Sequence, residues 1–257
     1  RPYEFVCRRA ELDDPISIKY LKRFVNDQIL SYAMTRSTPA EPAPLTSNKK
    51  GAIIGAGPCG MTAAFFLRRK GHAVEVFEEL KEPGGMSAVG IPDYRLPREI
   101  VRVEVERIAE TGVTFHYGVR IGKDKTLKQL RSEFDAVLIT IGAHGSKNVR
   151  MEGEETKPSG LISGVTFLRD LNLLYPSGKF TPPVGETVAV IGGGNVALDC
   201  ARSARRLGYK KVIVIYRRTE KEMPADNEEI RDAKHEGIEF HFLTHPIRLE
   251  IKDEKVA

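Results

Sequence analysis

Two glycine-rich segments, residues 55–60 and 192–197, constrain the fold of this chain more than any other part of its sequence. Both follow the spacing Gly-x-Gly-x-x-Gly or Ala, and each lies between an apolar run and a stretch with helical apolar spacing. Such a turn brings backbone N–H groups to a helix N-terminus, where they and the helix dipole attract a pyrophosphate. We therefore predict an α/β protein with two Rossmann-like dinucleotide-binding domains.

The residues around each glycine turn repeat one plan of alternating strands and helices. Apolar runs rich in β-branched residues favour strands, and apolar residues three or four positions apart favour helices. In the first unit we expect strands at 52–54, 73–78, 113–117 and 136–140, and helices at 61–67 and 97–111. In the second unit we expect strands at 187–191, 211–216 and 238–243, and a helix at 196–207.

The residues at the end of the second strand differ between the two units. Glu78 ends strand 73–78, and a carboxylate there can accept hydrogen bonds from both hydroxyls of an unphosphorylated ribose, as in FAD or NAD. Arg217 and Arg218 take its place in the second unit, and guanidinium groups form charge-assisted, bidentate bonds to a 2'-phosphate. The pair predicts one unphosphorylated dinucleotide and one NADP(H). The alternative is two plain strand-to-helix turns with both arginines facing solvent.

The predicted elements divide the chain into four segments. Residues 1–47 form a helical segment, with Ile18, Leu21, Val25 and Ile29 on one stripe, and an exposed linker over 35–47. Residues 48–145 form the FAD-binding half-domain, and residues 146–183 a connector with one helix at 165–174. Residues 184–257 form the NADPH-binding domain. Both dinucleotide domains read as incomplete at their C-termini, so we expect a fragment of a longer protein.

Longer motifs around the turns resemble a known family, the flavin- and NADPH-binding small (beta) subunit of glutamate synthase and the matching region of dihydropyrimidine dehydrogenase. The resemblance extends from Asp14 onward, and its motifs are residues 84–86, 90–97, 192–199, 216–219 and 222–224.

This resemblance implies a role for each matching residue. The FAD pyrophosphate would contact Gly55, Ala56, Gly57, Pro58 and Gly60, and its ribose Glu78. The flavin side of that cofactor would lie along Gly85, Met86 and Arg95, with the backbone of Ile121 as a weaker candidate. The NADPH pyrophosphate would contact Gly193, Gly194, Asn195 and Val196, and its 2'-phosphate Arg217 and Arg218. Residues 140–143 resemble the turn through which the chain crosses between the domains.

The three cysteines, Cys7, Cys59 and Cys200, form no Cys-x-x-Cys pair, which argues against a disulfide reductase. We interpret Cys59 and Cys200 as small packing residues. In the resembling family an N-terminal domain holds iron–sulfur clusters through several cysteines, and Cys7 occupies a place comparable to the last of them. A cluster needs about four ligands, so we expect one only in the full-length protein or a partner.

The net charge of +5 does not by itself indicate nucleic acid. Arg202, Arg205, Arg206, Lys210 and Lys211 cluster on or after one helix whose other face is apolar, which favours a solvated helix face over a nucleic-acid patch. The longest uncharged stretch, residues 51–67, is too short to span a bilayer, so we expect a cytoplasmic protein. His241 and His245 lie in a strand-like region, where they would not point together at a metal.

No catalytic acid and base set appears in the sequence, as expected where cofactors carry the chemistry. We predict an FAD-dependent oxidoreductase module that accepts a hydride from NADPH. It would pass electrons to iron–sulfur centres or a partner subunit, the glutamate synthase large subunit being one candidate. A non-catalytic nucleotide-binding fragment of a larger complex is the alternative. A flavin monooxygenase or a disulfide reductase is a third interpretation, against which the missing thiol pair counts.

Overall fold

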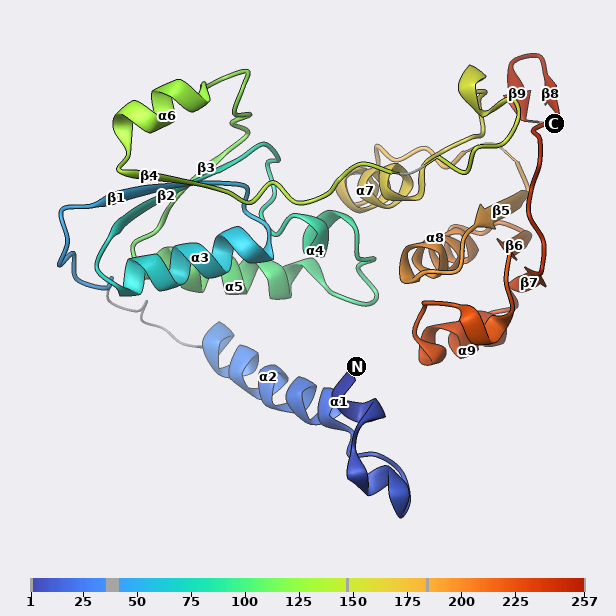
Figure 1. Ribbon diagram of the computed structural model, residues 1–257, viewed down its shortest axis with the longest axis horizontal. Coiled ribbons are helices and arrows are strands. Elements are labelled where there is room, and N and C mark those ends of the chain that lie inside the picture. The colour runs from blue at the N-terminus through green and yellow to red at the C-terminus, as the bar shows by residue number, and fades with distance from the viewer. Residues whose placement is uncertain (1, 36–41, 147, 184, 257) are drawn as a thin grey trace.

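A computed structural model describes residues 2–35, 42–146, 148–183 and 185–256 (Figure 1). The first unit contains a parallel sheet with the strand order β3-β2-β1-β4. Its strands are β1 (Lys50–Ile54), β2 (Ala73–Glu78), β3 (Thr114–Tyr117) and β4 (Ala136–Ile139). Its helices are α3 (Pro58–Arg69), α4 (Met86–Val89), α5 (Arg98–Glu110) and α6 (Leu127–Glu133). The strands and longer helices predicted for this unit are confirmed, whereas α6 was not foreseen.

Alternation along β1 explains why this sheet is covered on both faces. Ile53 packs with Ala64 of α3, whereas its neighbours Ala52 and Ile54 pack with Leu130 of α6. Successive side chains of a strand point to opposite faces, so a fully apolar run suits a sheet with helices on both sides. Figure 1 shows α3 and α5 on one side of the sheet and α6 on the other.

The second unit is a smaller parallel sheet with the strand order β5-β6-β7. Its strands are β5 (Thr187–Ile191), β6 (Lys211–Tyr216) and β7 (Glu239–Phe242), and its helices are α8 (Asn195–Arg206) and α9 (Asn227–His235). Val212 and Val214 of β6 pack against Leu198 of α8 and Ile230 of α9. The three predicted strands and the first helix are confirmed, and α9 is an addition.

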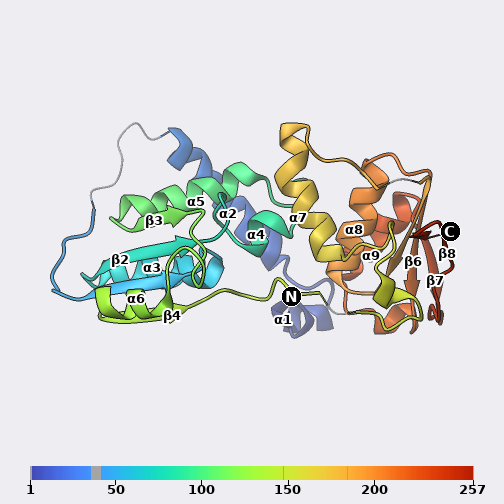
Figure 2. The ribbon, with the colours of Figure 1, turned by 90° about the horizontal axis from the view of Figure 1, so that it is seen from above.

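The connector joins the two units through α7 (Gly164–Leu174), which contacts both α4 and α8. The sheets lie toward opposite ends of the molecule, with α4 and α7 between them (Figures 1 and 2). Short elements complete this part: η2 (Glu154–Thr156), η3 (Tyr175–Ser177), η4 (Glu220–Glu222) and a hairpin of β8 (Ile251–Lys252) and β9 (Lys255–Val256). The helix predicted at 165–174 is therefore confirmed.

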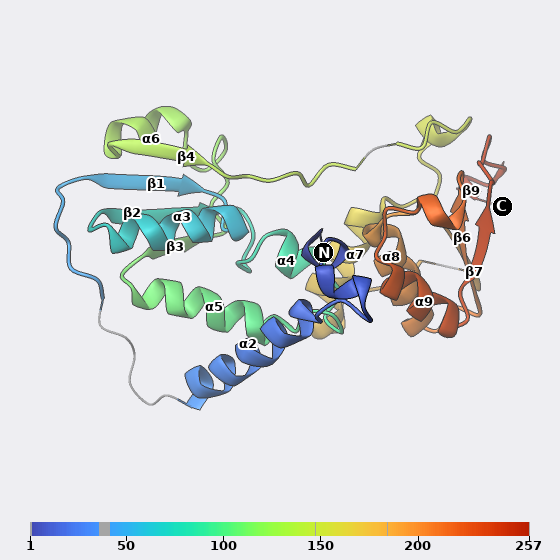
Figure 3. The same cartoon turned by 60° about the horizontal axis from the view of Figure 1, so that its bottom comes forward.

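The N-terminal segment contains α1 (Pro2–Phe5), η1 (Arg8–Glu11) and α2 (Ile18–Thr35), which runs beside α5 (Figure 3). The predicted apolar stripe is largely exposed, since Leu21, Val25 and Ile29 retain 57%, 53% and 43% of their accessible surface. Residues 36–41 of the predicted linker lie outside the described residues. None of the helices in the described ranges combines the length and the apolarity that crossing a bilayer requires.

Candidate nucleotide-binding turns

The first glycine turn joins β1 to α3 and holds a backbone that only glycine tolerates at two positions. Gly55 has a φ of 104°, and a Cβ there would lie 2.6 Å from the carbonyl oxygen of Thr140. A Cβ on Gly60 would lie 2.0 Å from the carbonyl oxygen of Gly55. These two glycines are therefore explained by contacts within the protein.

Gly57 differs, because no contact within the described part of the chain requires a glycine there. A Cβ at this position would meet nothing nearer than the Cα of Gly85, at 4.0 Å. Gly57 is also the N-cap of α3 and no side chain caps the helix there, so the first backbone N–H groups keep their capacity to bind an anion. An open glycine in front of an uncapped helix is the feature that a dinucleotide pyrophosphate requires. The residues present thus fit FAD.

Glu78 lies beside this turn, where the sequence argument requires it. Its Oε2 accepts a hydrogen bond from the N–H of Ala56 at 2.7 Å, and its Oε1 accepts one from the N–H of Leu80 at 2.8 Å. The side chain is 7% exposed. A carboxylate offers about four acceptor positions, so two bonds leave capacity for ribose hydroxyls. The backbone holds this carboxylate at the edge of the turn.

The glycine loop that precedes α4 closes over the same turn. The N–H of Gly84 donates to the carbonyl oxygen of Ala56 at 2.9 Å, and a Cβ on Gly85 would lie 2.9 Å from the Cα of Gly57. Met86 opens α4 directly behind this contact. These two predicted flavin-side residues, Gly85 and Met86, therefore adjoin the pyrophosphate turn, and their contact with a flavin stays a prediction.

Ile121 and Arg95, also predicted beside the flavin, lie elsewhere in the first unit. Ile121 packs against the core cluster that contains Phe77 and Leu130. The Arg95 guanidinium is paired with Asp199, at 2.7 Å, and with Glu229, at 3.3 Å, both from the second unit. Contact of either residue with a flavin stays a prediction.

The second glycine turn joins β5 to α8 and repeats the geometry with one change. A Cβ on Gly193 would lie 2.5 Å from the ring of Tyr216, so that glycine is needed for packing. Gly194 is the open position, with nothing nearer to a Cβ than Pro224, at 4.0 Å. It is the N-cap of α8, again without a side-chain cap. The open, uncapped glycine therefore occurs in both units.

The segment after η4 folds back on this second turn. The Oδ1 of Asn195 accepts from the N–H of Asp226 at 3.0 Å, and the carbonyl oxygen of Gly193 accepts from the N–H of Ala225 at 3.1 Å. The Asn195 side chain is thus engaged by the protein, which leaves its backbone N–H and that of Val196 as candidate pyrophosphate donors. Tyr216 donates from its hydroxyl to the carbonyl oxygen of Glu222 and fixes the other end of the segment.

Arg217 and Arg218 follow β6 directly. In the strand register Glu78, the last residue of β2, corresponds to Tyr216, the last residue of β6, so the two arginines stand one and two residues beyond the position of the carboxylate. β6 pairs with the turn-bearing strand β5 as β2 pairs with β1. Both arginines are exposed. Hydrogen bonds from Thr219, with a contribution from the charge of Arg218, lower the pKa of the nearby Glu222 carboxyl, so Arg218 has an acidic neighbour. Exposed guanidinium groups can turn their donors toward a phosphate group, and the residues present fit a 2'-phosphorylated dinucleotide.

Two predictions made from helix faces are wrong. Cys59 lies in the first turn of α3 but is exposed, so it is not a packing residue. Arg202 is 7% exposed and does not lie on a solvated face, because Glu229 and Asp232 of α9 and Glu236, which caps that helix, pair with its guanidinium. Cys200 is buried as predicted, and burial raises the pKa of its thiol to about 12.

The contacts of Tyr94, Asp199 and Glu229 between the two units were not predicted from the sequence. A signal was present for Asp199, which lies among apolar positions of α8 where a carboxylate needs a partner. In the described part of the chain no group of three His, Cys, Asp or Glu side chains is arranged to hold a metal ion.

Comparison with known proteins agrees with this geometry. The chain is 46% identical over 271 residues to the NADP(+)-dependent formate dehydrogenase subunit beta of Moorella thermoacetica, covering 96% of this chain and 37% of that protein. It is 40% identical over 257 residues to the NADPH-Fe(3+) oxidoreductase subunit beta of Geobacter sulfurreducens, covering 99% and 37%. It is 33% identical over 242 residues to the glutamate synthase [NADPH] small chain of Escherichia coli, covering 92% and 50%. The chain thus spans half of these relatives or less.

Solved structures share the fold. FprA from Mycobacterium tuberculosis in complex with NADPH superposes with a TM-score of 0.69 at 23% identity, over 82% of this chain and 62% of that one. Thioredoxin reductase from Lactococcus lactis gives a TM-score of 0.58 at 22% identity, over 81% and 69%. The pyridine nucleotide-disulphide oxidoreductase family matches residues 49–257, which include both glycine turns. The chain belongs to this family.

Proposed function

We propose that this chain is the nucleotide-binding part of an NADPH-dependent flavoprotein that takes up a hydride and passes electrons to a partner. The observation that carries the proposal is the contrast between the ends of β2 and β6. A buried carboxylate held by backbone N–H groups ends β2, whereas two exposed arginines follow β6. When bound, NADPH supplies a hydride that FAD accepts, and FAD can then release electrons singly.

Residues of the chain would bind and orient these cofactors. The uncapped N-terminus of α3 would hold the FAD pyrophosphate behind Gly57, and Glu78 would accept the ribose hydroxyls. The N-terminus of α8 would hold the NADPH pyrophosphate behind Gly194, with Arg217 and Arg218 on the 2'-phosphate. The hydroxyl of Thr140 donates to the carbonyl oxygens of Ile54 and Gly55 and would keep the first turn in shape.

The electron acceptor is proposed to lie outside this chain. The similar proteins are named for different reactions, NADP(+)-dependent formate dehydrogenase, NADPH-Fe(3+) oxidoreductase and glutamate synthase, and are called a beta subunit or a small chain. Shared nucleotide turns in proteins named for different reactions support a module that passes electrons to iron–sulfur centres or to a partner subunit. A glutamate synthase large subunit is one such partner, although the formate dehydrogenase and Fe(3+) oxidoreductase subunits are more similar to this chain. The free thiols Cys7, Cys59 and Cys200 suit a cytoplasmic protein.

Anaerobic mixing of the FAD-loaded full-length protein with NADPH tests the proposal. We expect the visible flavin absorption to bleach with NADPH, and far more slowly with NADH at the same concentration. Retention of FAD without any bleaching would instead support the non-catalytic nucleotide-binding fragment. Bleaching that is equally fast with both coenzymes would remove Arg217 and Arg218 from the proposal.

A further inference from the structure

The loop between α4 and α5 reaches out of the first unit and contacts both helices of the second. It carries Tyr94 and Arg95, and the N–H of Arg95 donates to the carbonyl oxygen of Pro92 at 2.9 Å to close a turn. Arg98 braces the loop by donating to the carbonyl oxygen of Ile91 at 2.7 Å and to that of Ser87 at 3.2 Å. These hydrogen bonds hold the loop in one conformation, from which the side chains of Tyr94 and Arg95 reach the second unit.

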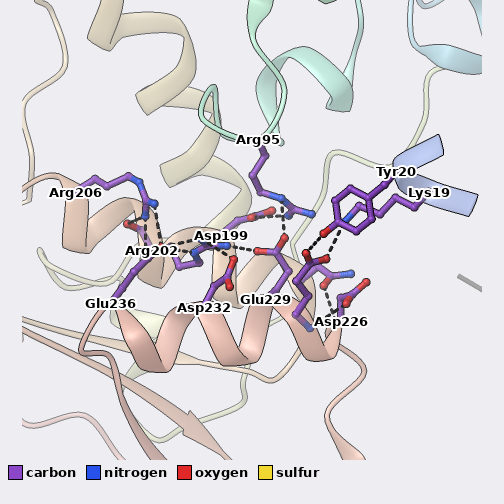
Figure 4. A network of polar contacts seen from close by, with 12 residues as sticks. Lys19, Tyr20, Arg95, Asp199, Arg202, Arg206, Asp226, Glu229, Asp232 and Glu236 are labelled. Carbon is purple, nitrogen blue, oxygen red and sulfur yellow. Dashed lines mark hydrogen bonds and ion pairs between the residues drawn. The ribbon is translucent and has the colours of Figure 1, made fainter. Parts of the chain in front are cut away.

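Arg95 links the first unit to two carboxylates on different helices. Its Nη1 donates to Asp199 of α8 at 2.7 Å, and its Nε lies 3.3 Å from Glu229 of α9 (Figure 4). The side chains of Asp199 and Glu229 are 6% and 11% exposed, so solvent screens these pairs weakly. Without Arg95, Asp199 would lose the cation that donates to it, and Glu229 would keep only its pair with Arg202. Loss of the cation would therefore leave the desolvation penalty of buried Asp199 less well compensated.

Tyr94 adds a second contact beside the ion pairs. Its ring lies under the guanidinium of Arg206, 3.9 Å from the ring centroid, and 5.3 Å from that of Arg202. Arg202 pairs with Glu229, and Arg202 and Arg206 both pair with Glu236. The Tyr94 ring therefore contacts two guanidinium groups of α8 that ion pairs already hold in place. Burial, reinforced by nearby carboxylates, raises the pKa of Tyr94 and keeps its hydroxyl neutral.

The contact joins elements that adjoin the two glycine turns, beside the connection that α7 makes between α4 and α8. On one side, α4 and the loop follow Gly85, which touches Gly57 of the first turn. On the other side, Asp199 belongs to α8, whose N-cap Gly194 is the open position of the second turn. A shift of the Arg95 pairing would therefore rotate α8, and with it any pyrophosphate at its N-terminus, relative to the first turn.

We propose that Tyr94 and Arg95 form an interdomain clamp with Asp199 and Glu229, which sets the orientation of the second unit relative to the first. Given the proposed function, on which this role rests, they are positioning residues that hold the nicotinamide at the distance and angle needed for hydride transfer. Small errors in such an alignment lower the rate of transfer far more than the affinity of either cofactor.

The clamp can be tested in the full-length, FAD-loaded protein with Arg95→Gln and the matched control Arg102→Gln. Arg102 also pairs with a glutamate, Glu82, but that pair lies within the first unit. Hydrogen exchange without NADPH should become at least about tenfold faster over residues 92–97 and at the facing parts of α8 and α9 in Arg95→Gln alone. Unchanged exchange in Arg95→Gln would overturn the clamp.

A second measurement separates positioning from a merely structural role. The rate constant of flavin reduction at saturating NADPH should fall at least about tenfold in Arg95→Gln, while the Kd of NADPH changes less than about threefold and FAD content stays constant. Arg95→Lys, which keeps a cation, should recover most of that rate. Loss of FAD, or a parallel rise in Kd, would contradict the positioning role.

The same series distinguishes failure of the clamp from failure of the proposed function. A wild-type protein that NADPH cannot reduce would overturn the proposed function and the role in hydride transfer. The exchange data would then decide on the clamp alone, with faster exchange in Arg95→Gln supporting it and unchanged exchange overturning it.

Discussion

The two glycine turns share a backbone plan and differ in the charge that follows their second strand. Glu78, the last residue of β2, is buried, and the N–H groups of Ala56 and Leu80 donate to its two carboxylate oxygens. After β6, Arg217 and Arg218 are exposed. A carboxylate held in place can accept hydrogen bonds from hydroxyls without reorganising, whereas exposed guanidinium groups can turn their donors toward a phosphate. We therefore propose that the side chains at the strand ends, and not the glycine turns, distinguish the two nucleotides.

The comparison extends to burial and to charge within each unit. Helices cover both faces of the first sheet, whereas α8 and α9 cover one face of the second. The second unit places a nearly buried guanidinium, that of Arg202, among three carboxylates. The first unit therefore depends mainly on apolar packing, and the second also on an ion network that pH can weaken.

Thiol reactivity gives the largest expected difference between the two turns. Cys59 opens the first-turn helix and is exposed, whereas Cys200 lies in the second-turn helix, buried, with its pKa raised to about 12. Since the thiolate is the reactive form, iodoacetamide at neutral pH should label Cys59 at least about a thousandfold faster. Mass mapping of peptides over time measures both rates. Equal labelling would show that the second unit opens more readily than its packing indicates.

Exchanging the charge at the second strand end should have the next largest effect. In Arg217→Glu/Arg218→Glu the ratio of NADPH to NADH affinity should fall at least about a hundredfold, because hydrogen bonds to charged groups contribute roughly 1.5–3 kcal/mol each. Titration calorimetry with both coenzymes measures it. The control Arg231→Glu/Lys252→Glu makes the same charge change at exposed sites, and a similar loss there would point to net charge instead.

An added methyl group should affect two glycines of the first turn differently, lowering mainly the stability of the fold at Gly60 and mainly the binding of FAD at Gly57. Gly60→Ala places a Cβ against the backbone oxygen of Gly55 and should lower the free energy of unfolding by ~2–4 kcal/mol. Gly57→Ala meets open space and should cost less than about 1 kcal/mol, yet weaken FAD binding. Denaturant titrations and FAD content measure the two effects. Equal destabilisation would mean that the open glycine has a packing role.

The ion network should make the second unit acid-sensitive, with a smaller effect. Burial raises the pKa of Glu236, but hydrogen bonds from Arg206 and Arg202 outweigh it and lower that pKa to about 2, from 4.5. A lowered pKa stabilises the fold above pH 4.5, and the contribution is lost as pH falls through about 2. Glu236→Gln should therefore lower the free energy of unfolding at pH 7 by ~1–3 kcal/mol, and this deficit should shrink below pH 4.5.

The control for that experiment is Glu186→Gln. Glu186 pairs with Lys210 in the same unit, but both side chains are exposed, so the variant should change unfolding by less than about 1 kcal/mol. Urea unfolding followed by circular dichroism across the pH range measures both variants. A deficit in Glu236→Gln that stays constant down to pH 2 would contradict the network.

Sequence patterns were informative where the determinant is local. Strands β2, β5 and β6 have the expected bounds, because apolar runs between glycine turns leave few other placements. Local signals for two missed helices were also present. Thr126 and Gln129 form a capping box at α6, and Asp226 caps α9 before an acidic first turn. Both helices are short and polar, so apolar periodicity alone did not reveal them.

Long-range pairing was beyond the sequence analysis. Arg95 was assigned to the flavin by resemblance, and Arg202 to a solvated face by helical spacing. Their observed partners are carboxylates on other elements. Asp199, the partner of Arg95, lies 104 residues away from it in the sequence. Helical spacing indicates which residues share a face, but not what packs against that face.

The sequence by itself determined the two glycine turns, the strands that flank them and the change from carboxylate to guanidinium at the strand ends. These features depend on neighbours within a few residues, through backbone sterics and strand alternation. Only the tertiary structure decided that Glu78 is held by Ala56 and Leu80, and that Arg95 joins the two units. Such contacts arise when packing brings distant carboxylates and guanidinium groups out of water together, where each needs a partner.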